Sequence, residues 1–443
     1  MTNGPQVSAV RQAWPKRNLA LFMLLSANFL CFADRYVLAS VVPGLRKDIF
    51  GDPEHYWAPV RFMIRLLQPL LGSNPENAMI GVLNMGFMVT YMFGAPYVAT
   101  LKIQRWYIIG VGLILWSFAT GGSGYVSTFE MMLLTRMMVG VGEAAYGPLA
   151  PTLISDMFPT SMRAMAMSIY AMATPFGSAA GYALGGYMMV AYGWRWAFYV
   201  AVIPGVVLGI ACFFMKDPVH AAATAEPKPT WKDRMMEFKL CLHNRSFAYN
   251  MFASTAMTFA IGGVGFWIPS YIVEYRGLGN PEFVNLLFGG ILVLGGVGGT
   301  LCGGWLSDRL NHKDRSAYMK TSACSMALTL PCTIAMLYVP FPYAWGFLGL
   351  AVFCLFFNAG SVAAIITNVT APSMRASAFA ISIFFTHALG DVISPFIIGA
   401  IADGTGGNMN VAFLAVSAAV AVAAVLWWKG MPHLAADSKY AEQ

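Results

Sequence analysis

The sequence predicts an all-α membrane protein, with twelve transmembrane helices in two pseudo-symmetric bundles of six. Three observations lead to this fold class. Of the 443 residues, 58% are hydrophobic and only 11% are charged. Apolar runs of about 20 residues recur along the chain, and each is long enough to cross a hydrocarbon core of roughly 30 Å. A short motif of the first half also returns at the same place in the second half.

Twelve apolar runs, called spans below, are expected to be helices. They cover residues 18–44, 78–101, 105–126, 129–157, 162–190, 195–215, 247–275, 283–308, 318–339, 343–370, 375–402 and 409–429. The first span follows a polar N-terminus, Met1 to Lys16, and is too long and uninterrupted for a cleaved signal peptide. We expect it to be retained.

The chain divides at its one long polar segment, Lys216 to Arg245. This segment predicts an N-terminal bundle of residues 1–215, a linker of residues 216–246 and a C-terminal bundle of residues 247–443. The sequence Phe158–Ala164 opens the fifth span, and the similar Thr370–Ala376 opens the eleventh. Parallel six-helix repeats characterise one large class of secondary transporters.

The distribution of cationic residues predicts the topology. Of the 27 Lys and Arg residues, two lie within spans, and 19 lie on the side of both termini and the linker. The remaining six lie on the other side: Arg46, Lys47, Arg61, Arg65, Arg195 and Arg276. The positive-inside rule then puts both termini in the cytoplasm. The net charge of +7 is explained in this way without a nucleic-acid partner.

The sequence lacks the motifs that indicate disulfides, metal sites, enzymatic activity or ATP-driven pumping. Six of the seven cysteines lie within spans and Cys241 lies in the linker, so we expect no structural disulfide. We find no Cys/His spacing typical of a metal site, no nucleophile–base pair and no ATP-binding loop. The sequence therefore predicts no metal, no cofactor, no enzymatic activity and no primary pumping.

Two further features concern packing. Within the outer loop 46–77, residues 56–71 alternate apolar side chains with Arg61 and Arg65, which predicts an interfacial amphipathic helix. We expect it to cap the outer rim, with contact to lipid headgroups as the alternative. Glycines recur in steps of four in the fifth and eighth spans, which favours close helix packing over a gating role. They are Gly177, Gly181, Gly185, Gly295, Gly299 and Gly303.

Charged residues inside two spans are the strongest indication of function. Asp34 and Arg35 lie in the first span, and Arg136 and Glu143 lie seven residues apart on one face of the fourth. Ionised groups at bilayer depth are costly, so they are expected to face a cavity and to mark a substrate or proton pathway. Asp34 is turned about 100° from Arg35 and should point toward a neighbouring helix. A static structural ion pair is the alternative.

Other polar residues join this candidate site. Asn28 lies seven residues before Arg35, and Tyr146 lies just beyond Glu143. His387 and Asp391 are four apart in the eleventh span, so they can meet on one face, either as a functional pair or as core residues. The predicted gating residues are Asp308 and Arg309, which end the eighth span, and Asp156 and Arg163 of the first half.

Two sets of motifs resemble a known family. The six-plus-six arrangement, the basic linker and the sequence Gly303–Arg309 resemble the major facilitator superfamily. More narrowly, residues 28–36 with Pro43, and residues 136–152, resemble the spinster family of lysolipid and sphingosine-phosphate transporters. We expect a bacterial member. The resemblance implies a polar cavity centre at Asp34, Arg35, Arg136 and Glu143, protonation of its acidic members, and a headgroup site near His387.

One loop departs from the superfamily pattern. The segment from Phe93 to Arg105, after the second span, has no Asp. We therefore expect the cytoplasmic gate of the first half to close with different partners.

The sequence thus predicts a proton-coupled secondary transporter of amphipathic lipids, such as lysophospholipids, that works by alternating access. Arg35, Arg136, Asn28, Tyr146 and His387 would bind the substrate, while Asp34 and Glu143 would exchange protons. The alternatives are a transporter of small organic anions, since an Arg-rich cavity suits any carboxylate or phosphate, and a receptor or structural protein that transports nothing. We expect a monomer among membrane lipids in the inner (plasma) membrane.

Overall fold

The computed structural model describes residues 16–50, 56–72, 75–98, 100–101, 103–217, 231–371 and 374–441. The predicted cytoplasmic N-terminus before residue 16 and residues 218–230 of the predicted linker lie outside the described residues. Every regular element in the described part is helical. The predicted all-α fold class is confirmed.

The chain forms two compact units. Unit 1 comprises residues 1–61, 83–226 and 272–289, and unit 2 comprises residues 62–82, 227–271 and 290–443. The helices of the first half are α1 (Arg17–Ile49), α2 (Ala58–Leu71), α3 (Glu76–Val98), α4 (Arg105–Tyr125), α5 (Phe129–Ala144), α6 (Leu149–Met157), α7 (Thr160–Ala191) and α8 (Trp194–Cys212).

The helices after residue 230 continue this numbering. They are α9 (Trp231–His243), α10 (Arg245–Ser270), α11 (Pro281–Asn311), α12 (Ala317–Tyr338), α13 (Tyr343–Phe356), α14 (Ala359–Val369), α15 (Arg375–Thr386), α16 (Ser394–Gly404) and α17 (Met409–Ala441). Two π-helical turns, η2 (Tyr271–Tyr275) and η3 (His387–Asp391), continue α10 and α15. Helix α9 lies within the predicted linker and was not anticipated from the sequence.

Ten helices in the described residues are long and apolar enough to cross a membrane. Two predicted spans fall outside this set. The fifth is the 32-residue helix α7, and the fourth consists of two shorter helices, α5 and α6. The break lies at residues 145–148, where Pro148 cannot donate a backbone hydrogen bond. The tenth span is also interrupted, at Phe357 and Asn358 between α13 and α14, where no proline is present.

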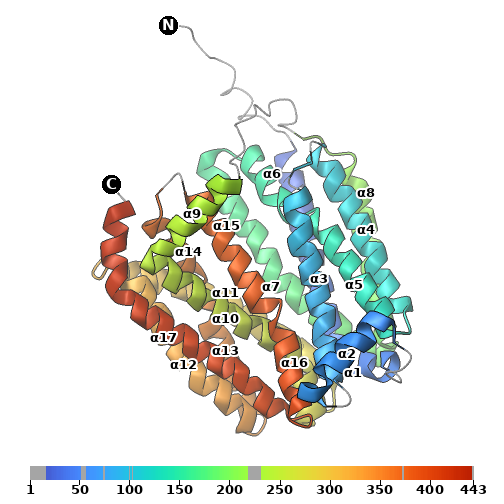
Figure 1. Ribbon diagram of the computed structural model, residues 1–443. Coiled ribbons are helices and arrows are strands. Elements are labelled where there is room, and N and C mark those ends of the chain that lie inside the picture. The colour runs from blue at the N-terminus through green and yellow to red at the C-terminus, as the bar shows by residue number, and fades with distance from the viewer. Residues whose placement is uncertain are drawn as a thin grey trace. The chain divides into compact units, whose positions relative to one another are not determined.

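In unit 1, glycines allow α7 to lie directly against α1. A Cβ atom on Gly177 would meet the Phe29 carbonyl oxygen, and one on Gly181 would meet that of Ala33. Figure 1 shows α4 and α5 of the same unit running side by side. In unit 2, Gly299 and Gly303 of α11 approach the carbonyl oxygens of Phe353 and Phe357 in the same manner. Both glycine stripes therefore lie where helix backbones meet.

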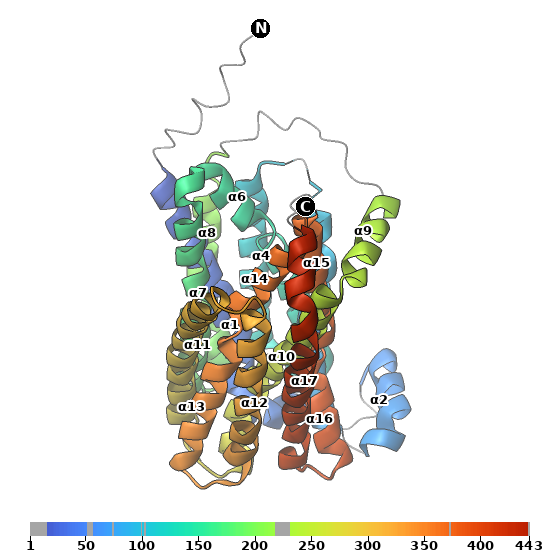
Figure 2. The ribbon, with the colours of Figure 1, turned by 90° about the vertical axis from the view of Figure 1, so that its left-hand side faces the viewer.

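In unit 2, the long helix α17 packs beside α10 and α12, and Figure 2 shows α17 next to α12. The Trp427 indole of α17 is fully buried and donates a hydrogen bond to the Asn250 side chain of α10 at 3.0 Å. The Trp267 indole of α10 donates to the Pro395 carbonyl of α16 at 2.9 Å. These two aromatic side chains hold unit 2 together.

Two short segments belong to the unit of the other sequence half. Residues 62–82 are part of unit 2, where the Asp403 carboxylate accepts hydrogen bonds from the Asn77 side chain at 2.7 Å and from the Ala78 N–H at 2.8 Å. Residues 272–289 are part of unit 1, where Arg46 lies 3.5 Å from Glu274. The predicted division of the chain at residues 216–246 stays a prediction, and at these two segments the contacts do not follow it.

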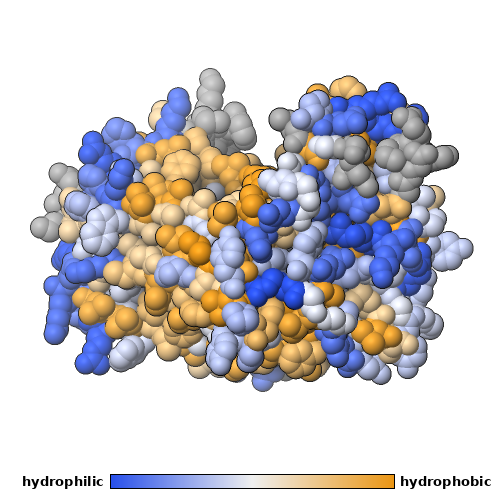
Figure 3. Space-filling model, turned by 90° about the horizontal axis from the view of Figure 1, so that it is seen from below, coloured by the Kyte–Doolittle hydropathy of each residue, from blue (hydrophilic) through white to orange (hydrophobic). Residues whose placement is uncertain are grey.

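The predicted amphipathic helix at 56–71 is confirmed as α2, Ala58–Leu71. Its interfacial position stays a prediction. Large apolar side chains reach the surface, among them Val111 at 58% exposure and Leu294 at 77%. Figure 3 shows hydrophobic residues at the surface beside hydrophilic ones. Surfaces of this kind suit a lipid environment better than water.

Candidate functional site

The four charged residues predicted from the spans come together inside unit 1, in two crossed pairs between α1 and α5. Arg35 of α1 pairs with Glu143 of α5, and Arg136 of α5 lies near Asp34 of α1. Asp34, Arg136 and Glu143 are each 2% exposed or less. Each helix therefore contributes one acid and one base to a buried, overall neutral cluster, called the charge cluster below.

The first pair is supported by a thiol and two rings. An Arg35 guanidinium nitrogen lies 3.2 Å from Glu143 Oε2, and the Cys31 thiol donates to the same oxygen at 3.0 Å. The guanidinium also lies 4.9 Å and 5.0 Å from the ring centres of Phe32 and Phe87. Such cation–π contacts are worth about 2 kcal/mol when desolvated, so the rings help to hold the cation inside the membrane.

Hydroxyl groups of α4 organise the second pair. Thr120 donates to Asp34 Oδ2 at 2.8 Å, and Arg136 donates to the Ser123 hydroxyl at 2.8 Å and 3.2 Å. The Arg136–Asp34 distance is longer, at 3.9 Å. Asp34 thus points toward α4, as its rotation from Arg35 predicted. The roles of Thr120 and Ser123 were missed, because nothing in the sequence distinguishes them from other hydroxyl residues in spans.

The charge cluster keeps unused hydrogen-bonding capacity. Asp34 Oδ1, Glu143 Oε1 and Arg35 Nε are buried and make no hydrogen bond. Leaving such a group unpaired costs about 1–3 kcal/mol. Beside the cluster lies a cavity of about 10 Å³ lined by Asp34, Arg35 and Arg136, with Asn84 and Phe87. This is roughly the volume needed by one water molecule. The cluster therefore has unpaired polar atoms beside a space that suits one water molecule.

The two other predicted binding residues of unit 1 make structural contacts. Asn28 donates its side-chain amide to the Tyr170 carbonyl of α7 at 3.1 Å. The Tyr146 hydroxyl donates to the Leu24 carbonyl of α1 at 2.7 Å, and its side chain is 2% exposed. Both side chains tie α1 to its neighbours, and their predicted contact with substrate stays a prediction.

His387 and Asp391 meet in unit 2, as their spacing predicted. The imidazole Nδ1 lies 3.0 Å and 3.1 Å from the two carboxylate oxygens, and the His387 side chain is 40% exposed. They form the π-helical turn η3, where Gly390 has non-helical backbone angles. A Cβ atom on Gly262 of α10 would lie 2.7 Å from Asp391, so this turn is packed tightly against α10.

The predicted gating residue Asp156 belongs to a triad that sequence analysis did not identify. Arg105, at the start of α4, binds Asp156 at 2.7 Å and both carboxylate oxygens of Asp217 at 2.6 Å and 2.8 Å. Arg105 ends the loop that lacks the superfamily's Asp, so its position was the available signal. The predicted gating residue Arg163 makes a different contact, with the Phe158 carbonyl at 3.1 Å.

At the end of α11, Asp308 accepts a hydrogen bond from the Tyr318 hydroxyl at 2.9 Å, and Arg309 lies 5.5 Å from the Trp305 ring centre. In the turn that follows, the Ser316 hydroxyl and backbone N–H donate to Asp314 at 2.6 Å and 2.8 Å. These hydrogen bonds hold the pKa of Asp314 below its usual value. The Asp314 carboxylate also lies 3.8 Å from the Lys320 ammonium of α12.

The sequence model of a protein family, the Major Facilitator Superfamily, matches residues 24–386 of this chain. The chain is also 30% identical over 423 residues to the zebrafish (Danio rerio) protein spinster homolog 3, an alignment that covers 90% of this chain and 79% of that protein. The chain belongs to the spinster family of the major facilitator superfamily. With its apolar helices, this spinster-family protein is a multi-pass membrane transporter and not an enzyme.

This chain is also similar to a named lipid transporter and to a transporter of known structure. The zebrafish sphingosine-1-phosphate transporter SPNS2 is 29% identical to this spinster-family chain, over 87% of this chain and 76% of that protein. The crystal structure of a bacterial homolog to the human lysosomal transporter Spinster, in an inward-facing and unoccupied conformation, superposes with a TM-score of 0.73. Its sequence identity is 17%, and the match covers 96% of this chain and 98% of that chain. This likeness shows the fold.

Proposed function

We propose that this spinster-family protein is a proton-coupled transporter of amphipathic lipids that carry a phosphate, such as lysophospholipids or sphingosine phosphates, and that it works by alternating access. The observation that carries the proposal is the charge cluster, in which the buried Arg136 and the half-buried Arg35 are each matched with a carboxylate that has a second, unused oxygen. A relative named for sphingosine-1-phosphate transport supports a substrate of this class.

The guanidinium groups are the proposed phosphate ligands. Arg35 has an unused Nε–H, and its side chain keeps 17% exposure inside an otherwise buried cluster. A guanidinium presents parallel donors that match two phosphate oxygens. Its aromatic neighbours Phe32 and Phe87 would contact the apolar part of an amphipathic ligand. A small organic anion would use only the first of these features.

The carboxylates are the proposed proton carriers. While Glu143 is ionised, it neutralises Arg35 and competes with a phosphate for the same guanidinium. Protonation of Glu143 removes this competition, so a proton and a phosphate favour each other's binding. Asp34 would likewise compete with a phosphate for Arg136 while it is ionised. Such reciprocal coupling between two ligands is required by linkage.

The remaining assignments complete the proposal. His387, Asn28 and Tyr146 are the further proposed ligands of the headgroup, with Asp391 as the partner of His387. Asp156, Arg163, Asp308 and Arg309 would control a cytoplasmic gate, with Arg105 as the cation that Asp156 binds. The protein would function as a monomer in the inner membrane, with both termini in the cytoplasm.

Ligand-induced thermal stabilisation of the purified protein tests the substrate class. We expect lysophosphatidylcholine and sphingosine-1-phosphate to raise the melting temperature more than glycerol phosphate or citrate, because a ligand that binds only the folded state stabilises it. Proteoliposomes with an imposed pH gradient then test coupling. Stabilisation by the short anions alone would exclude a lipid substrate, and lipid uptake that is independent of the gradient would exclude proton coupling.

A further inference from the structure

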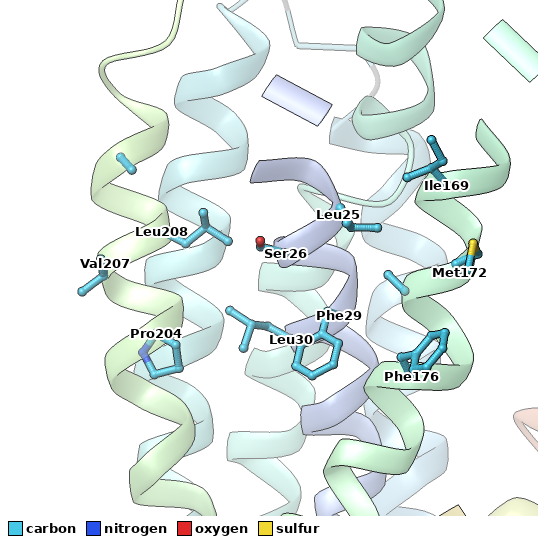
Figure 4. A pocket seen from close by; sticks show the side chains of 12 residues that line it. Leu25, Ser26, Phe29, Leu30, Ile169, Met172, Phe176, Pro204, Val207 and Leu208 are labelled. Carbon is cyan, nitrogen blue, oxygen red and sulfur yellow. The ribbon is translucent and has the colours of Figure 1, made fainter. Parts of the chain in front are cut away.

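A second cavity lies in unit 1, separate from the charge cluster, in a groove between α1, α7 and α8. Its volume is about 640 Å³, and its twelve lining residues are apolar except for Ser26. Figure 4 shows Leu25, Phe29 and Leu30 of α1 between Phe176 of α7 and Pro204 of α8. None of the residues that line the charge cluster's cavity lines this groove.

Where the groove begins, α7 presents larger side chains than the glycines that touch α1. At Gly177 and Gly181, the missing side chains let α7 touch the α1 backbone. On the N-terminal side of Gly177, the larger side chains of Met172 and Phe176 face the groove instead, with 50% and 47% exposure. These side chains form one wall of the groove, and residues of α1 form its floor.

The dimensions of the groove fit one lipid acyl chain within one leaflet. It extends over eight residues of α7, from Ile169 to Phe176, a helical rise of about 10 Å. One leaflet contributes roughly 15 Å of hydrocarbon. The volume lies within the range of about 300–1,000 Å³ typical of pockets that bury a small ligand. An acyl chain in this groove would contact apolar side chains of the protein over most of its length.

Cationic residues lie beyond one end of the groove. Lys16 and Arg17 precede Leu25 on α1 by two turns, which is about 12 Å, and Lys216 follows Ala211 of α8. Lys16 and Lys216 are exposed, and neither pairs with a carboxylate in the described part of the chain. The apolar groove and the cationic residues beyond its end are spaced like the acyl tail and the headgroup of a phospholipid.

We propose that this groove is a binding site for an anionic phospholipid of the surrounding leaflet, with an acyl chain against Phe29, Met172 and Leu208 and the headgroup phosphate near Lys16 and Lys216. The lipid is a bound component of the protein and not its transported substrate. The charge complementarity at the mouth selects an anionic over a zwitterionic headgroup, because each Lys or Arg near the membrane surface strengthens binding of an anionic lipid by about fivefold.

Photocrosslinking in proteoliposomes tests the site. Phosphatidylglycerol with a diazirine on its acyl chain should label peptides that contain Leu25–Leu30 and Ile169–Phe176 several-fold more than phosphatidylcholine with the same chain. Ala211→Phe, which fills the groove, should reduce this labelling. Lys16→Ala with Lys216→Ala should remove the headgroup preference, by up to about 25-fold. The matched controls are Val111→Phe on exposed α4 and Lys313→Ala with Arg315→Ala in the loop after α11.

Three outcomes would overturn the proposal. Labelling spread evenly over exposed apolar residues such as Val111 would show an ordinary lipid-facing surface. Equal labelling by the two headgroups would remove the selectivity for anionic lipid. Displacement of the probe by lysophosphatidylcholine, at the concentrations that saturate its uptake, would assign the groove to the transported lipid. None of these results depends on whether the charge cluster carries protons.

Discussion

At the scale of single residues, small hydroxyl and thiol groups determine how the charged side chains pair. Ser123 accepts hydrogen bonds from two nitrogens of Arg136, and Thr120 donates to Asp34, so both members of this pair bind side chains of α4. Cys31 donates to Glu143 from the preceding turn of the helix that carries Arg35. Hydrogen bonds to charged groups contribute about 1.5–3 kcal/mol each. These neighbours are strong enough to select one pairing over another.

Replacement of Arg136 by Lys tests the headgroup role of the guanidinium. An ammonium keeps the charge but cannot present two parallel donors. We expect affinity for a phosphate-bearing lipid to fall about tenfold to hundredfold, measured by isothermal titration calorimetry. Arg35→Lys should act in the same direction. Arg245→Lys, at the exposed start of α10, is the control.

The competing structural hypothesis holds that Arg136 only neutralises a carboxylate. Because Arg136 lies nearer Asp34 in the structure, the matching double variant is Arg136→Met with Asp34→Leu. Parent-like lipid affinity in both Arg136→Lys and this double variant would remove Arg136 from the headgroup site.

Replacement of Glu143 by Gln tests the proton switch. The amide imitates the protonated carboxyl, so it should free Arg35 from its ion pair at every pH. We expect lipid uptake to lose its dependence on the pH gradient, and Asp34→Asn to weaken that dependence as well. The control is Glu130→Gln on the same helix, where the carboxylate accepts a hydrogen bond from the Trp57 N–H. An unchanged pH profile in both site variants would exclude these residues as the coupling site.

At the scale of helices, glycine positions decide which faces can touch. On α7, Gly185 would meet the Ser40 side chain of α1, just as Gly177 and Gly181 meet α1 carbonyl groups. Several other glycines, including Gly349 of α13, have open space around them. A glycine in a helix costs about 1 kcal/mol relative to alanine. Its use in α7 is therefore explained by the close approach of α1.

Alanine at Gly181 and at Gly349 should have opposite effects. The added methyl group at Gly181 must push against the α1 backbone at Ala33, which we expect to destabilise the protein by about 1–3 kcal/mol. At Gly349 it meets nothing within 4 Å and should be neutral or stabilising by up to about 1 kcal/mol. Thermal unfolding in detergent measures both. Equal stability of the two variants would contradict the packing role of Gly181.

At the scale of the whole molecule, surface charge determines orientation and apolar surface determines location. The predicted topology places most cationic residues on the side of the termini and the linker, and few on the side of residues 46–77. The exposed apolar residues of α4 and α11, such as Val111 and Leu294, suit contact with lipid tails. This surface is therefore suited to a lipid bilayer.

Labelling of introduced cysteines tests the orientation. In intact cells, we expect Arg65→Cys in α2 to react with a membrane-impermeant maleimide, and Arg315→Cys after α11 to react only after permeabilisation. Both positions are exposed, and the unsubstituted protein measures the background from native cysteines. Reaction of Arg315→Cys from outside would reverse the proposed topology.

The sequence by itself determined the features that depend on local periodicity. Apolar runs long enough to cross a bilayer placed the helices, and the spacing of Arg61 and Arg65 among apolar residues indicated α2. Helical spacing also placed Asp34 away from Arg35 and brought His387 to Asp391. These results need only the geometry of one helix.

Only the tertiary structure decided how the helices meet. It paired Arg35 with Glu143, joined Arg105 to Asp156 and Asp217, and placed residues 62–82 in unit 2. It also broke the fourth span into α5 and α6 and opened the groove beside Gly177. The physical reason is that each of these features depends on the rotation and separation of helices. Contacts between residues far apart in the chain set both quantities, and helical periodicity carries no information about them.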